Sequence, residues 1–150
     1  MVMTGDSSCF VDANVLVYAN VAESPFHQPA FQAIKRHYEI GDELWVSRQV
    51  LREFLATLTR PKLFTNPRPI SIVIERVQFF ETSFRVAEDN PQVTARLLEL
   101  IEQIAVGGRQ VHDANIVATM LVYGVRRLLT HNVADFRRFS HLIDVEPLVV

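Results

Sequence analysis

The chain has 150 residues, of which 49% are hydrophobic and 21% are charged, the proportions of a folded globular protein. Its formal net charge is −2, which excludes a globally basic nucleic-acid binder. The one cysteine, Cys9, excludes an internal disulfide framework and indicates a reducing cytoplasm, and the longest apolar stretch, Val15 to Ala22, is too short to cross a membrane.

Short apolar segments alternate with amphipathic ones along the whole chain. In chain order we expect a strand at 9–11, a short turn of helix capped by Asn14, a helix at 25–39, a strand at 44–46, a helix at 48–58, a helix at 70–80, a strand at 84–86, a helix at 91–104, a helix at 112–122, a strand at 127–130, a short helix at 133–139 and a strand at 145–150. The proline-rich segment 60–69 is the clearest loop. This alternation predicts an α/β protein of one domain, residues 1–150: a three-layer α/β/α sandwich with a central, mainly parallel sheet.

Four acidic residues, Asp12, Glu53, Asp113 and Asp135, lie in or beside apolar segments: VDANVLVYA, VLREFLATL, VHDANIVATM and LLTHNVADF. A buried, unpaired carboxylate costs several kcal/mol or changes its pKa until it is neutral. Four such residues in a small domain indicate convergence on a positive charge, and a divalent metal is the simplest candidate. Asp12 follows the first strand directly and Asp135 follows the 127–130 strand, so both are expected at the edge of the sheet where ligands bind.

Each of these carboxylates also has a purely structural interpretation. Asp12 is a common turn residue, and Asp113 at the start of a helix complements the helix dipole. Glu53 flanks an apolar helix face, where glutamate is most often solvated or paired with a neighbouring arginine. Asp135 stands three residues after Asn132, which is the spacing of a reciprocal helix cap.

Taken in order, these segments resemble the PIN-domain family, in particular the VapC-type toxins of bacterial toxin–antitoxin pairs. VDANVLVYA resembles the first motif, SRQVLREFLATLTRP the second, and VHDANIVATMLVYGVRRLLTHNVADF the third and fourth. The resemblance spans residues 9–150. It implies a PIN-like α/β/α sandwich that binds Mg²⁺ or Mn²⁺, cleaves RNA, forms a homodimer and is inhibited by a VapB-like antitoxin.

The resemblance also implies roles for individual residues. Asp12 and Asp113 match the positions that hold the metal, and all four acids match the catalytic set, which is Asp12, Glu53, Asp113 and Asp135. The positions expected to support these acids are Asn14, Thr130 and Asn132. Asn132 stands where some members have an acid, so a second metal is left open. The implied reaction is hydrolysis by a metal-activated water, which leaves a 5′-phosphate and a 3′-hydroxyl.

Basic residues near the second and fourth motifs are candidates for contacts with RNA phosphates, namely Arg48, Arg60 and Arg137. A solvated helix face is the alternative for each of them. Two other functions compete with the ribonuclease: a non-catalytic PIN-like domain that binds RNA or protein, and a Mg²⁺-dependent receiver or phosphohydrolase with an aspartyl nucleophile. A receiver usually has a lysine late in the chain, whereas the lysines here, Lys35 and Lys62, are both early.

Overall fold

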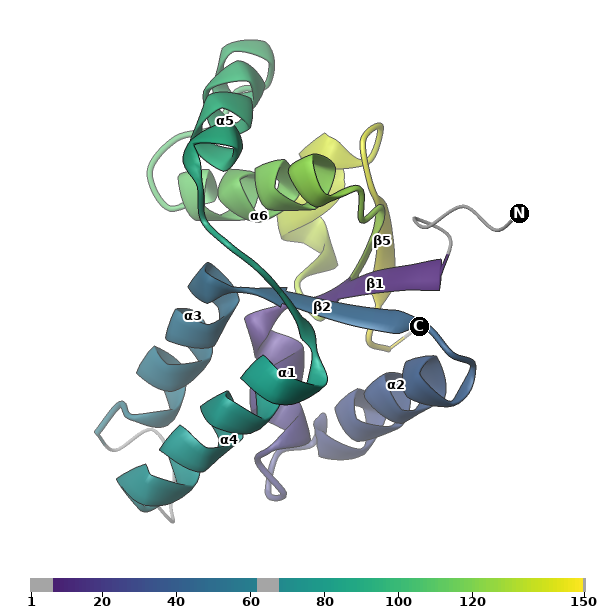
Figure 1. Ribbon diagram of the computed structural model, residues 1–150, viewed down its shortest axis with the longest axis vertical. Coiled ribbons are helices and arrows are strands. Elements are labelled where there is room, and N and C mark those ends of the chain that lie inside the picture. Colours follow the sequence, from purple (N-terminus) through teal and green to yellow (C-terminus); the bar gives the residue numbers. More distant parts are fainter. Residues whose placement is uncertain (1–6, 62–67, 150) are drawn as a thin grey trace.

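Five parallel strands form the centre of the computed structural model, which describes residues 7–61 and 68–149 (Figure 1). The strands are β1 (Ser8–Val11), β2 (Glu43–Ser47), β3 (Arg85–Ala87), β4 (Arg127–Thr130) and β5 (Asp144–Pro147). Their order in the sheet is β3-β2-β1-β4-β5, and every neighbouring pair is parallel. All four residues of β1 are buried, as expected for a central strand covered by helices on both faces.

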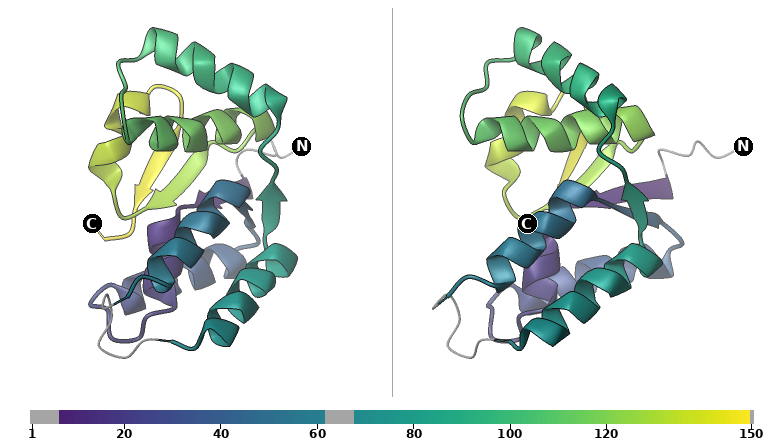
Figure 2. Two further views of the ribbon diagram at one scale, coloured as in Figure 1. Left: turned by 90° about the vertical axis from the view of Figure 1, so that its left-hand side faces the viewer. Right: turned by 60° about the vertical axis from the view of Figure 1, so that its left-hand side comes forward.

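The helices form one layer on each face of this sheet (Figure 2). One layer contains α1 (Ala13–Ala19), α2 (His27–Glu39), α3 (Arg48–Leu58) and α4 (Ile70–Ser83), and the other contains α5 (Pro91–Gln103), α6 (Gln110–Tyr123) and the 3₁₀ helix η2 (Val133–Phe139). Within the layers α1 packs on α2 and α3, and α5 packs on α6. The predicted three-layer sandwich with a parallel sheet is confirmed. In the described ranges no helix combines the length and the apolar character that crossing a membrane requires.

Each expected strand and helix is present, with ends that differ by at most three residues from the predicted ones. The predicted loop at 60–69 falls largely on residues 62–67, which lie outside the described residues. One predicted helix cap is wrong: Asp12, and not Asn14, caps α1, because its Oδ1 accepts a hydrogen bond from the Ala13 N–H at 2.8 Å. Asn132 stands at the N-cap position of η2, as predicted, but its side chain makes no capping hydrogen bond, and its own N–H donates to Thr130 Oγ1.

A cluster of ionisable side chains around the buried His37 lies at the edge of the sheet where β2 and β4 begin. The imidazole of His37, at the end of α2, is 2% exposed and bridges two carboxylates. Its Nδ1 lies 2.6 Å from Asp42 Oδ2 and its Nε2 lies 2.7 Å from Glu146 Oε2. Arg127, the first residue of β4, forms an ion pair with the same Asp42 oxygen at 3.0 Å. This cluster ties α2 to β4 and to the edge strand β5.

Candidate active site

The site lies where the direction of the strand order changes, between the adjacent strands β1 and β4. Asp12 follows the last residue of β1, and Thr130 is the last residue of β4. α3 starts directly after β2 and brings Glu53 to the same edge. α6 leads back into β4, so its first turn, which contains Asp113, also lies at the carboxyl ends of the strands. Elements far apart in the chain therefore deliver carboxylates to one edge.

Asp12 is held in place by a network of hydrogen bonds. Its side chain is 6% exposed, and its Oδ2 accepts from Thr130 Oγ1 at 2.8 Å and from Asn14 Nδ2 at 3.2 Å. The Asn14 amide also donates to Thr130 Oγ1 at 3.3 Å and accepts from the His131 N–H at 3.0 Å. Asn14 and Thr130, named from the sequence as supporting residues, thus orient the Asp12 carboxylate and join β1 to the end of β4.

Three of the four acids are influenced electrostatically by the charge of at least one other. Burial raises the pKa of Asp12, and the charge of Asp135 raises it further, against the opposing hydrogen bonds from Thr130, Ala13 and Asn14. Burial, followed by the charges of Asp12 and Asp113, raises the pKa of Glu53 to about 7. Burial, followed by the charges of Asp135 and Asp12, raises the pKa of Asp113 to about 6. A cation among these groups would therefore be stabilised by each of them.

A cavity of about 710 Å³ opens in front of these carboxylates. Glu53, Asp113, Asp135 and Asn132 line it, so the structure brings together the acids predicted from the second, third and fourth motifs. Their donors are all oxygens, which fits Mg²⁺ or Mn²⁺ rather than a softer metal. Within the described ranges, no three His, Cys, Asp or Glu side chains enclose a metal by themselves. Mg²⁺ accepts such a site because it is usually held by one or two carboxylates and keeps several waters.

The cavity also contains residues that were not singled out from the sequence. Gln49 and Arg109 are two of them, and Gln49 is 7% exposed although it is polar. Gln49 stands four residues before Glu53, so the two side chains share one face of α3. That spacing is the signal that could have identified Gln49. Arg109 had no comparable signal, because it precedes α6 in a glycine-containing connection.

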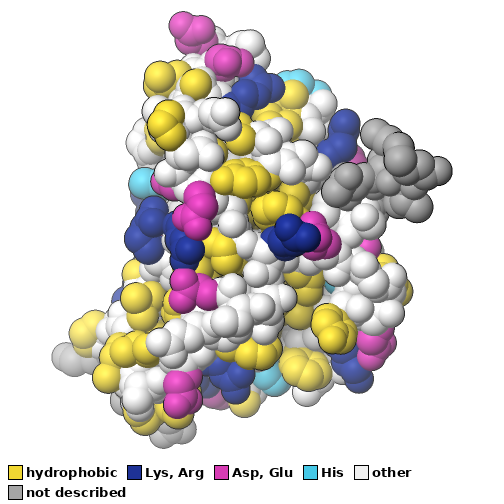
Figure 3. Space-filling model, in the orientation of Figure 1, with side chains coloured by type: hydrophobic (Ala, Val, Ile, Leu, Met, Phe, Trp, Pro, Cys, Tyr) yellow, Lys and Arg dark blue, Asp and Glu magenta, His cyan; other side chains and the backbone are white. Residues whose placement is uncertain are grey.

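The three arginines proposed to contact phosphate are placed differently. Arg48 forms ion pairs with Glu81 and with Glu88, the latter at 2.9 Å, and it does not line the cavity, so its geometry gives no support for a phosphate contact. Arg60 and Arg137 are exposed and lie outside the cavity lining, and their contacts with RNA stay predictions. Basic and acidic side chains lie side by side on the face shown in Figure 3 and form no single basic patch there.

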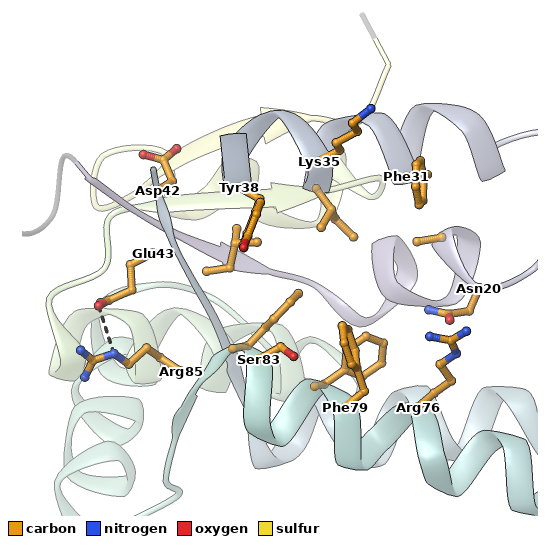
Figure 4. A pocket seen from close by; sticks show the side chains of 15 residues that line it. Asn20, Phe31, Lys35, Tyr38, Asp42, Glu43, Arg76, Phe79, Ser83 and Arg85 are labelled. Atoms are coloured by element: carbon orange, nitrogen blue, oxygen red, sulfur yellow. Dashed lines mark ion pairs between the residues drawn. The ribbon is translucent and has the colours of Figure 1, made fainter. Parts of the chain in front are cut away.

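A second cavity of about 760 Å³ lies between α2 and α4, away from the four acids. In Figure 4, Phe31 and Tyr38 of α2 face Phe79 of α4 across it. The ion pair between Arg85 and Glu43, at 3.0 Å, lies at one end. Its walls are mainly apolar and offer no cluster of acids, so this groove does not fit metal-assisted chemistry.

Comparison with known proteins assigns the fold to a family. The sequence profile described as "PIN domain" matches residues 9–142, which is most of the chain. The protein belongs to the PIN-domain family. Among curated PIN-domain relatives it is similar to "Ribonuclease VapC48" of Mycobacterium tuberculosis, with 28% identity over 141 residues that cover 91% of this chain and 94% of the relative.

Solved structures agree with this PIN-domain assignment. One is the VapBC2 complex of Rickettsia felis bound to a DNA fragment from its promoter, with a TM-score of 0.67 and 17% identity over 93% of this chain and 98% of that one. Another is VapC20 of Mycobacterium tuberculosis, described as a sarcin–ricin loop cleaving toxin, with a TM-score of 0.65 and 17% identity over 93% of this chain and 99% of that one. At these identities the likeness shows a shared fold.

Proposed function

We propose that this PIN-domain protein is a divalent-metal-dependent endoribonuclease and the toxin of a toxin–antitoxin pair. The observation that carries the proposal is the convergence of Asp12, Glu53, Asp113 and Asp135 at the β1–β4 edge, where burial and the neighbouring acidic charges raise the pKa of Asp12, Glu53 and Asp113. A structural cap or turn needs no such grouping. The similarity to a curated VapC ribonuclease supports the same reaction, and the intact set of acids argues against a non-catalytic domain.

Asp12 and Asp113 would hold the cation. Asp12 is suited to this because hydrogen bonds from Thr130 and Asn14 fix the orientation of its carboxylate at the end of β1. Asp113 is half-buried in the first turn of α6 and opens into the cavity. When bound, a divalent cation would supply a Lewis acid that acidifies a water molecule and neutralises charge on a phosphodiester.

Glu53 and Asp135 are assigned the handling of water and protons. A carboxyl group whose pKa is about 7 can accept a proton near neutral pH, which suits Glu53 to orient an attacking water and take its proton. Asp135 is exposed, lines the same cavity and can accept a second hydrogen bond from that water. Arg52 and Arg109 line the same cavity and are placed to position a phosphate.

Cleavage of end-labelled RNA by the purified protein tests the reaction. We expect cuts that require Mg²⁺ or Mn²⁺, that disappear with EDTA, and that leave a 5′-phosphate and a 3′-hydroxyl. Asp12→Asn should abolish them, whereas Asp89→Asn, an exposed aspartate outside the site, should cut like the wild type. Products ending in a cyclic phosphate would instead indicate attack by the RNA 2′-hydroxyl and would refute the water mechanism.

We infer a VapB-like antitoxin and a homodimer as the assemblies of this toxin. The structural neighbours include VapBC2, a toxin–antitoxin complex, which supports the first inference. Co-expression with the product of a small adjacent gene should give a stable complex and relieve growth arrest caused by the wild type. Light scattering on the isolated protein should give twice the mass of the 17.1 kDa chain. A monomeric mass at micromolar concentration would refute the dimer.

A further inference from the structure

The amide of Gln49 connects the two helices that carry Glu53 and Asp113. Its Nε2 donates to the carbonyl oxygen of His112 at 2.9 Å, and its Oε1 accepts from Asn115 Nδ2 at 2.8 Å. His112 and Asn115 flank Asp113 in α6, whereas Gln49 stands one turn before Glu53 in α3. We call these two hydrogen bonds the Gln49 bridge.

Apart from the Gln49 bridge, α3 and α6 make few contacts with each other. α3 belongs to the layer of α1 and α4 and packs on them and on β2, whereas α6 belongs to the opposite layer and packs on α5 and η2. Within the described parts of the chain, the Gln49 bridge is the hydrogen-bonded connection between α3 and α6. The Gln49 bridge therefore links the helices that carry the two carboxylates directly, from one layer to the other.

The chemistry of the amide suits it to this role. A primary amide has both N–H donors and an oxygen acceptor, so Gln49 can donate to the His112 carbonyl and accept from Asn115 at the same time. Gln49 also lies near enough to Glu53 to lower its pKa, against the larger effect of burial. A buried amide without partners would be unfavourable, and here both its oxygen and its nitrogen are satisfied. An apolar side chain could fill the same space but could not join α3 to α6 by hydrogen bonds.

We propose that Gln49 is a positioning residue that sets the distance between Glu53 and Asp113, and that Asn115 is its partner in this role. The inference rests on the proposed metal-dependent nuclease function. It assigns no contact with RNA or with the reacting atoms to Gln49. It predicts that loss of the Gln49 bridge impairs the catalytic step and cation binding more than it impairs RNA binding.

Gln49→Met tests the bridge, because methionine has a similar length and no hydrogen-bonding amide. In protein shown to be folded, we expect kcat for RNA cleavage to fall at least tenfold while KM changes less than threefold. The Mn²⁺ concentration that gives half of the full thermal stabilisation should rise at least fivefold. Gln92→Met, an exposed glutamine of α5, is the matched control and should change neither quantity.

The exchange variant Gln49→Asn with Asn115→Gln separates positioning from simple packing. It keeps two amides and their combined length across the gap, so it should recover part of the activity that Gln49→Asn loses alone. If Gln49→Met does not fold, Asn115→Ala removes one of the two hydrogen bonds and should show the same pattern in milder form. A kcat and an Mn²⁺ response within twofold of wild type in folded Gln49→Met or Asn115→Ala would overturn the inference.

The Mn²⁺ titration needs no cleavage, so it distinguishes the two levels of the proposal. If the wild type cuts RNA and the bridge variants match it in both readouts, the nuclease assignment stands and the positioning role fails. If the wild type cuts no RNA but reaches half of its thermal stabilisation at a lower Mn²⁺ concentration than Gln49→Met does, the bridge still organises a cation site. The nuclease assignment then fails.

Discussion

Replacing Glu53 by glutamine removes one of the mutually repelling charges without changing the size of the side chain. In the metal-free protein, burial and the charges of Asp12 and Asp113 raise the pKa of Glu53 from 4.5 to about 7. Between these values the folded protein keeps a proton that the unfolded chain has lost. The free energy of unfolding therefore falls as the pH rises from 4.5 to about 7, and it changes little above that.

The magnitude follows from the same pKa. At about 1.36 kcal/mol for each pH unit, the full difference corresponds to roughly 3.4 kcal/mol. Glu53 is only half-buried, and solvent screening reduces this to about 1–2 kcal/mol. Glu53→Gln should therefore be more stable than the wild type by this amount at pH 8 and equally stable near pH 4. For a chain of this length the difference corresponds to a rise in Tm of roughly 2–8 °C.

Thermal and urea unfolding in EDTA, at several pH values between 4 and 8, measures this difference. Glu102→Gln, an exposed glutamate of α5, is the matched control and should show no pH-dependent gain. In excess Mn²⁺ the order should reverse, because the wild type binds the cation more tightly. A Glu53→Gln variant that is no more stable than the wild type at pH 8 in EDTA would refute the mutual repulsion of these carboxylates.

Four further outcomes are expected. Mg²⁺ or Mn²⁺ should raise the Tm of the wild type at neutral pH, and EDTA should remove the gain, as differential scanning fluorimetry would show. Asp12→Asn should abolish RNA cleavage in the end-labelled assay and raise the metal-free Tm, because burial penalises its charge. His37→Leu should lower the free energy of unfolding in urea by about 3 kcal/mol, because Asp42 and Glu146 lose their shared partner. Arg109→Ala should raise KM for RNA and weaken its dependence on salt while leaving kcat nearly unchanged.

The elements and the layer order could be predicted because local pattern and topology agree. The apolar run around Phe10 allowed one interpretation, a buried strand, and the stripe of Val50, Phe54 and Leu58 allowed one helix phase. Parallel strands linked by helices place their carboxyl ends at one edge, so the placement of Asp12 and Asp135 at that edge could be expected from chain order. Side-chain partners did not follow, since they depend on which residues the tertiary fold brings within 3 Å.

Asn14 and Asn132 illustrate that difference. Both stand at helix starts, where asparagine usually caps by local hydrogen bonding. In the structure, Asn14 donates instead to Thr130, which is 116 residues away in the chain, and the Asn132 side chain faces the cavity. Arg48 likewise pairs with Glu81 and Glu88, 33 and 40 residues away, rather than with a phosphate. A local motif cannot choose between such distant partners.

A buried polar residue that takes no part in the chemistry, such as Gln49, is found from the structure and not from the sequence. A buried carboxylate can be recognised from the sequence because its charge makes burial costly. Gln49 is neutral, so its burial costs less and cannot be recognised from the sequence in this way. The positioning role proposed for it is suggested only by its two hydrogen bonds to α6. If Glu53 and Asp113 must stand at a fixed separation, the connection between layers has to be directional as well as favourable. Hydrogen bonds provide direction and hydrophobic contacts do not, which is the physical reason to expect an amide at this position.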